Sequence, residues 1–145
     1  MMKGLSPRLL AVVDALPLRT GLRVLDIGCG SGATAREIAR RIGDGHVLAI
    51  DRSAKAIAQA RSISRTQLAA GLLSLRQVAI EDFELEPGEA RYEIAVAVRV
   101  GVLDGRHSER EARAKRRIAA AMARNGRLFI DGGDPLREIP LDDWK

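Results

Sequence analysis

Three glycines within five residues separate a short apolar run from a stretch of helical periodicity, in the sequence VLDIGCGSG at residues 24–32. Residues 22–27 are apolar and partly β-branched, as in a buried strand, and residues 33–42 carry apolar side chains at helical spacing. Glycine permits positive φ angles and close approach of a ligand to the backbone, and a helix N-terminus offers free N–H groups. The segment therefore predicts a binding loop for a nucleotide-like ligand.

Two carboxylates narrow the identity of that ligand. Residues 46–51, HVLAID, predict the next strand, and its terminal Asp51 can accept hydrogen bonds from both hydroxyls of a ribose. Asp26 lies two residues before the first glycine, where nicotinamide-binding loops usually carry an apolar residue. A carboxylate at that position suits a ligand with its own ammonium group, and S-adenosylmethionine has one.

Residues 26–32, DIGCGSG, resemble motif I of the class I S-adenosylmethionine-dependent methyltransferases, and residues 49–53, AIDRS, resemble their motif II. The likeness extends from about Leu5 to Asp131. It implies that the glycine loop packs under the methionine part of the cofactor, that Asp51 binds the ribose, and that Arg52 lies against the adenine. The loop residues that the resemblance assigns to the cofactor are Asp26, Gly28, Cys29, Gly30 and Gly32.

The adenine side departs from the family pattern. Members often have an acidic residue after the third strand, and Ala79 stands in that position here. We therefore expect the backbone at Ala79 and Ile80, or the carboxylate of Glu81 or Asp82, to meet the adenine. Arg99 follows the fourth predicted strand, at the carboxyl end where open α/β sheets bind ligands, and is the last predicted cofactor residue.

Helices and strands alternate along the chain with short connections, which predicts a doubly wound, Rossmann-like α/β fold. We expect one domain over residues 1–145, beginning with a helix within residues 1–17. Five parallel strands in the order 3-2-1-4-5 follow from right-handed crossovers. The fifth strand is predicted at residues 127–131, and the tail at 132–145 contains no convincing element for the family's usual strands six and seven.

A fifth strand without those neighbours would be an open apolar edge. Unpaired backbone groups beside Leu128, Phe129 and Ile130 would favour pairing with another chain. Either the tail covers this edge, or two chains form a homodimer there. Charged residues at the strand ends are a third way of protecting it.

The chain carries a net charge of +5, but its basic residues are spread along the sequence. The densest cluster, at residues 110–117, falls on a predicted helix with i, i+4 acidic partners and is typical of a solvated face, so a nucleic-acid partner is left open without being indicated. No apolar run is long enough for a signal peptide or a membrane span, and we expect a cytoplasmic protein. The single cysteine excludes an intramolecular disulfide, and no metal-ligand spacing occurs.

The resemblance implies methyl transfer from S-adenosylmethionine to an acceptor, most simply a small molecule. The Asp/Asn-Pro-Pro-aromatic motif that holds amino-nitrogen acceptors is absent, and Asp104 and His107 are the candidates for a general base. An RNA or protein methyltransferase and a non-catalytic cofactor-binding subunit remain alternatives. A nicotinamide-binding Rossmann domain is the alternative outside the family, because Gly28, Gly30 and Ala33 also fit its fingerprint.

Overall fold

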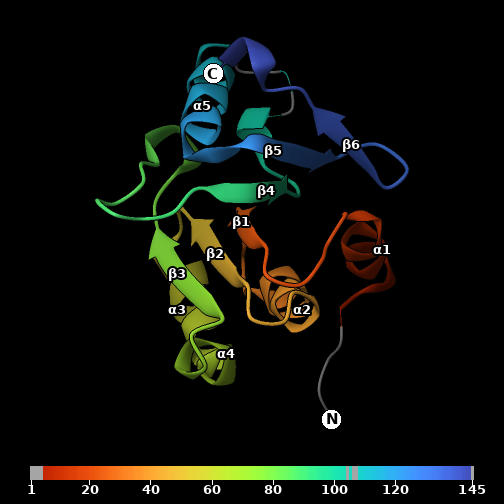
Figure 1. The fold of residues 1–145 in the computed structure, drawn as a ribbon, viewed down its shortest axis with the longest axis vertical. Helices are drawn as coiled ribbons and strands as arrows, with labels where there is room; N and C mark the ends of the chain where they lie inside the picture. The colour runs from red at the N-terminus through yellow and green to blue at the C-terminus, as the bar shows by residue number, and fades with distance from the viewer. Residues whose placement is uncertain (1–4, 104, 106–107, 145) are drawn as a thin grey trace.

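The computed structural model describes residues 5–103, 105 and 108–144 of the chain. Its centre is one six-stranded sheet in the order β3-β2-β1-β4-β5-β6 (Figure 1). The strands are β1 (Arg23–Ile27), β2 (His46–Asp51), β3 (Leu73–Gln77), β4 (Tyr92–Ala97), β5 (Met122–Asp131) and β6 (Leu136–Ile139).

The first five strands are parallel to their neighbours and lie in the predicted order. Ile27, the last residue of β1, pairs with Ile50 of β2 and with Ala97 of β4. The carboxyl ends of the three central strands therefore meet at one edge of the sheet, and the loops that follow them share that edge. This arrangement confirms the Rossmann-like fold expected from the sequence.

The expectation of only five strands is wrong. Residues 136–139 of the predicted tail form β6, which runs antiparallel to β5 in a register that pairs Leu128 with Ile139 and Asp131 with Leu136. Arg127 of β5 and Glu138 of β6 also form an ion pair at 2.7 Å. The tail thus covers the edge of the fifth strand, which is the first of the alternatives expected from the sequence. Four residues sufficed for the added strand, which is too short to stand out in the sequence pattern.

Helices cover both faces of the sheet. They are α1 (Pro7–Ala15), α2 (Ala33–Arg41), α3 (Ala54–Ile63), α4 (Arg65–Ala69) and α5 (Ser108–Ala121), with 3₁₀ turns η1 (Ile80–Asp82), η2 (Gly101–Leu103) and η3 (Asp142–Trp144). One buried cluster joins α1 and α2 to one face, and a second joins α5 and η1 to the other. Figure 1 shows α5 apart from α1 and α2, on the far side of the strands.

Two element boundaries differ from the predictions. The sequence between a cap at Ser53 and Gly71 predicts one long helix, but the structure divides it at Ser64, which is fully buried and accepts a hydrogen bond from Arg36. The turn residues Asn125 and Gly126 predict the end of the next helix there, but that helix ends at Ala121 and β5 begins directly after it. The pairing of β5 with β4 shifts register between Tyr92 and Ile94, so the first residues of β5 form an irregular strand. Their side-chain pattern does not distinguish such a strand from the end of a helix.

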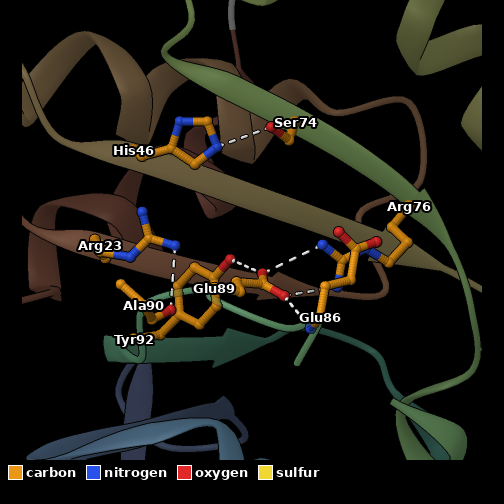
Figure 2. Close-up of polar contacts among 8 residues, drawn as sticks. All are labelled: Arg23, His46, Ser74, Arg76, Glu86, Glu89, Ala90 and Tyr92. Atoms are coloured by element: carbon orange, nitrogen blue, oxygen red, sulfur yellow. Dashed lines mark hydrogen bonds and ion pairs between the residues drawn. The ribbon is translucent and has the colours of Figure 1, made fainter. Parts of the chain in front are cut away.

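A polar cluster holds the long connection between β3 and β4, which contains little regular structure (Figure 2). Arg76 of β3 donates two hydrogen bonds to the Glu89 carboxylate, at 3.3 and 3.2 Å, and the Tyr92 hydroxyl donates a third at 2.5 Å. Arg23 lies over the Tyr92 ring and donates to the carbonyl of Ala90. Burial and the Glu89 carboxylate both raise the pKa of Tyr92, which stays protonated at neutral pH. The cluster lies near the amino ends of β1 and β4, away from the glycine loop.

Within the part of the chain that the structure describes, no helix has the length and apolar character needed to cross a membrane.

Candidate functional site

The glycine loop turns sharply between β1 and α2. Gly28, Gly30 and Gly32 all have positive φ angles, of +71°, +54° and +86°. The N–H groups of Gly28 and Cys29 both donate to the carbonyl of Ile50, at 2.9 Å each. These bonds attach the start of the loop to the end of the neighbouring strand β2, so the two predicted motifs form one structural unit.

Arg36, which the sequence pattern did not single out, holds the other end of the loop. Its guanidinium group donates to the carbonyl of Ser31 at 2.7 Å and to the hydroxyl of Ser64 at 2.9 Å. A Cβ atom at Gly32 would lie 3.0 Å from the same guanidinium nitrogen. Gly32 therefore serves the packing of the loop.

Asp51 lies at the end of β2 with both carboxylate oxygens in use. One oxygen accepts the N–H of Gly30 at 2.9 Å, and the other accepts the N–H of Ser53 at the same distance. Each carboxylate oxygen has two lone pairs, so the group can accept further hydrogen bonds from a ligand. The backbone thereby fixes the carboxylate at the mouth of the cleft.

Asp26 is buried beneath the loop, with 4% of its surface exposed. Its Oδ2 atom has no hydrogen-bond partner within the described residues. Burial, and to a lesser extent the nearby Asp51 carboxylate, raises the pKa of Asp26 from 3.8 to about 7. An unsatisfied buried carboxylate is costly, and a bound cation would relieve that cost.

Two cavities follow the carboxyl edge of the sheet and meet at Gly28 and Arg99. The first, the loop-side cavity of about 290 Å³, lies along the glycine loop and is lined by Asp26, Gly28, Cys29, Gly30 and Arg99 among others. The second, the ribose-side cavity of about 280 Å³, includes Gly28, Asp51, Arg52, Ala79, Ile80, Glu81 and Arg99. Apart from Gly32, the predicted cofactor residues therefore line two adjoining cavities, which together are called the cleft.

The wall of the ribose-side cavity is held in place by α5. Arg110 pairs with Glu81 at 3.7 Å, and Arg113 pairs with Asp82 at 3.0 Å and donates to the carbonyl of Glu81 at 2.6 Å. Arg117 pairs with Glu84 in the same way. Lys115 pairs with Glu111 at 3.6 Å, as the i, i+4 spacing predicted, but three arginines of this exposed helix face also form a clamp on residues 81–84. Sequence spacing could not reveal it, because the partners lie about thirty positions earlier.

The structure describes one of the remaining candidate residues, Cys29, but not the two candidate general bases. Burial and the two aspartates raise the pKa of Cys29 to about 12, so its thiol stays protonated and is no activated nucleophile. Asp104 and His107 lie outside the described residues. Asp131, at the end of β5, was not predicted; it accepts the N–H of Arg99 at 3.2 Å and pairs with Arg8 at 3.4 Å. No group of three or more metal-ligating side chains occurs among the residues described.

The chain is similar to known proteins in sequence pattern and in fold. A family model described as a methyltransferase domain matches residues 18–144. No curated protein matches the sequence.

Solved structures with the same fold include YcgJ from Bacillus subtilis, with a TM-score of 0.69 and 19% identity over 85% of this chain and 49% of that one. An S-adenosylmethionine-dependent methyltransferase from Mesorhizobium loti has a TM-score of 0.65 and 22% sequence identity, over 82% of this chain and 50% of that one. The cyclase SpnF has a TM-score of 0.67 and 25% sequence identity, over 84% of this chain and 42% of that one. The chain spans about half the length of the structures it matches.

Proposed function

The chain belongs to the methyltransferase-domain family, and on that premise we propose that it binds S-adenosylmethionine in the cleft and transfers the methyl group to a small-molecule acceptor. The observation that carries this proposal is the buried Asp26 carboxylate, whose Oδ2 atom lacks a partner among the described residues beside the loop-side cavity. The ammonium group of the cofactor would supply that partner. NAD has no ammonium group to donate to this carboxylate, because the charged nitrogen of its nicotinamide ring carries no hydrogen, and the pyrophosphate that Rossmann folds place at the glycine loop is an anion.

The other cleft residues fit the rest of the cofactor. Asp51 retains free lone pairs for the ribose hydroxyls while Gly30 and Ser53 hold it in place. Ala79 and Ile80 provide an apolar wall for the adenine, and Glu81 adds a carboxylate held by Arg110. Glu81 would thus take the place of the acidic residue that the family often has at the position of Ala79.

The chemistry demands little of the protein beyond placement. S-adenosylmethionine, when bound, supplies a methyl group on a positively charged sulfur, which leaves with the bonding electron pair as an acceptor lone pair attacks the methyl carbon. Orientation alone can contribute several kcal/mol, by analogy with the ~7–11 kcal/mol of well-oriented reactions. The role of this chain is therefore to fix the cofactor beside residues 99–101 and to hold an acceptor in direct contact with its methyl group.

A small acceptor is favoured over nucleic acid by the state of the basic residues. Arg110, Arg113 and Arg117 of the densest cluster are each paired with an acidic side chain. Paired arginines offer little attraction to a phosphate backbone, whose binding depends on the positive charges it neutralises. One structural neighbour is a cyclase, so the fold alone does not decide the reaction.

The test is a thermal-shift panel of S-adenosylmethionine, S-adenosylhomocysteine, NAD and NADP. A ligand at 100 times its dissociation constant stabilises the folded protein by about 2.7 kcal/mol. We expect both sulfur compounds to raise the melting temperature of the wild type, and neither nicotinamide to do so. Stabilisation by NAD alone, or by none of the four, would overturn the proposal. Binding without methyl transfer to any acceptor would favour a non-catalytic cofactor-binding subunit instead.

A further inference from the structure

A third cavity, of about 570 Å³, adjoins the cleft at residues 99–101. Arg99, Val100 and Gly101 line both this cavity and the ribose-side cavity. Its far side is formed by the ends of β5 and β6, including Ile130, Asp131 and Arg137. We call this space the β5 cavity. Its volume falls within the range of about 300–1,000 Å³ that is usual for small-molecule sites.

The β5 cavity combines an apolar floor with a charged rim. Ala97, Leu103 and Ile130 are buried apolar residues of its lining, whereas Arg99 and Arg137 are exposed at its mouth. Arg137 lies in β6, in register with Ile130 of β5. The unexpected sixth strand therefore brings this guanidinium group to the cavity. Pockets of this kind bind a ligand by its apolar body and orient it through a few polar groups.

The charges on the rim do not cancel. The Asp131 carboxylate is occupied, because one oxygen accepts the backbone N–H of Arg99 and the other faces Arg8 at 3.4 Å. Neither the Arg99 nor the Arg137 side chain has an acidic partner within 4.0 Å among the described residues. By contrast, Arg113 of the clamp and Arg127 of the neighbouring strand are both paired. Two uncompensated guanidinium groups thus face one small cavity.

From this arrangement we infer that the β5 cavity binds a small acceptor carrying a carboxylate or phosphate, with Arg137 and Arg99 as its anion-binding residues. Guanidinium groups donate paired hydrogen bonds to the oxygens of either anion. Because residues 99–101 line both cavities, an acceptor anchored in this way would lie next to the cofactor cleft, within reach of a methyl group held there. The role of the ligand as a methyl acceptor rests on the proposed function, but the anion site itself can be tested without methyl transfer.

The experiment measures binding of matched probes by isothermal titration calorimetry, with and without saturating S-adenosylhomocysteine. The probes are benzoate and phenyl phosphate, with benzamide as a neutral counterpart of benzoate. We expect the wild type to bind at least one anion at least tenfold more tightly than benzamide. Arg137→Gln is expected to remove most of that preference, and Arg137→Lys to retain part of it. Arg61→Gln, an exposed arginine on α3, serves as the matched control and is expected to match the wild type.

The outcomes separate the two proposals. Equal binding of benzoate and benzamide, absence of binding by all three probes, or unchanged anion preference in Arg137→Gln would overturn the anion site. Failure to bind S-adenosylhomocysteine would overturn the proposed function while the anion titrations alone still decide the site. A short RNA that displaces phenyl phosphate from the wild type with higher affinity would assign the arginines to a macromolecular acceptor and overturn the small-molecule inference.

Discussion

The backbone N–H of Gly30 donates a 2.9 Å hydrogen bond to the Oδ2 atom of Asp51, joining residues 21 positions apart in the sequence. One of these residues belongs to the glycine loop and the other ends the neighbouring strand. The bond orders the loop and orients the carboxylate at the same time. Changes at either position therefore affect both the shape of the cleft and its charge.

Replacing Asp51 with Asn removes the charge but keeps one acceptor oxygen for the backbone. A hydrogen bond to a charged group is worth about 1.5–3 kcal/mol, so we expect S-adenosylhomocysteine to bind roughly 10- to 100-fold more weakly, measured by calorimetry. Asp14→Asn is the control, because Asp14 pairs with Arg41 outside the cleft. Wild-type affinity in Asp51→Asn would contradict the assignment of Asp51 to the ribose.

Asp26 predicts a pH-dependent stability of the unliganded protein. The unfolded chain loses this proton near pH 3.8 and the folded protein near pH 7, so the folded state binds more protons between these values and loses stability as the pH rises. Asn does not titrate. We expect Asp26→Asn to match the wild type below pH 4 and to be more stable at pH 8, by up to about 4 kcal/mol at ~1.4 kcal/mol per pKa unit.

Urea unfolding at pH 4, 6 and 8 measures this difference. The same variant tests the ligand, because an ammonium group beside Asp26 favours the ionised carboxylate. Wild-type affinity for S-adenosylhomocysteine is expected to rise between pH 6 and pH 8, and that of Asp26→Asn is expected to stay weak and nearly constant. A variant less stable than the wild type at pH 8 would show that the buried carboxylate is satisfied in a way the structure does not contain.

Gly28→Ala tests the contact between the loop and the wall at residues 99–101. A Cβ atom at Gly28 would lie 2.8 Å from Val100 Cγ2, and the φ angle is +71°. We expect a loss of about 2–5 kcal/mol in unfolding free energy, the sum of roughly 1–2 kcal/mol for the left-handed backbone and about 1–3 kcal/mol for overpacking. Gly88→Ala is matched in φ, at +80°, but meets nothing within 4 Å. Equal destabilisation of the two variants would contradict the contact.

Arg113→Ala tests the clamp on the wall of the ribose-side cavity. Exposed ion pairs contribute about 0–1 kcal/mol, and the hydrogen bond to the Glu81 carbonyl adds about 0.5–1.5 kcal/mol. We expect S-adenosylhomocysteine to bind several-fold more weakly, with only a small change in melting temperature. Arg116→Ala, an exposed neighbour on α5, is the control. Identical affinities in the two variants would show that the wall keeps its shape without the clamp.

Truncation after Asp134 removes β6 and leaves the edge of β5 bare. Unpaired backbone groups along a strand that carries Leu128, Phe129 and Ile130 form a template for association. We expect a lower melting temperature and a mass that increases with protein concentration in light scattering. A truncated chain that stays monomeric with an unchanged melting temperature would contradict the protective role of β6.

The sequence was sufficient for those features that local pattern encodes. Glycine spacing predicted the loop, the apolar runs predicted five strands, and the rule of right-handed crossovers predicted their observed parallel order. The break at Ser64 and the clamp by Arg113 were not predictable, because each depends on a partner distant in sequence. Strand β6 is too short to show an alternating pattern, and Arg137 acquires its position only from pairing with β5.

The clamp from α5 to residues 81–84 has a consequence for the order in which the chain matures during synthesis. The glycine loop and Asp51 emerge from the ribosome first, but the wall opposite them is fastened by arginines made later, up to Arg117. A nascent chain that ends before α5 holds half of the cleft and lacks the arginines that fasten the other half. We therefore expect full ligand affinity only after α5 has been made, and a ligand bound in the cleft would link the early and late parts of the chain into one cooperative unit.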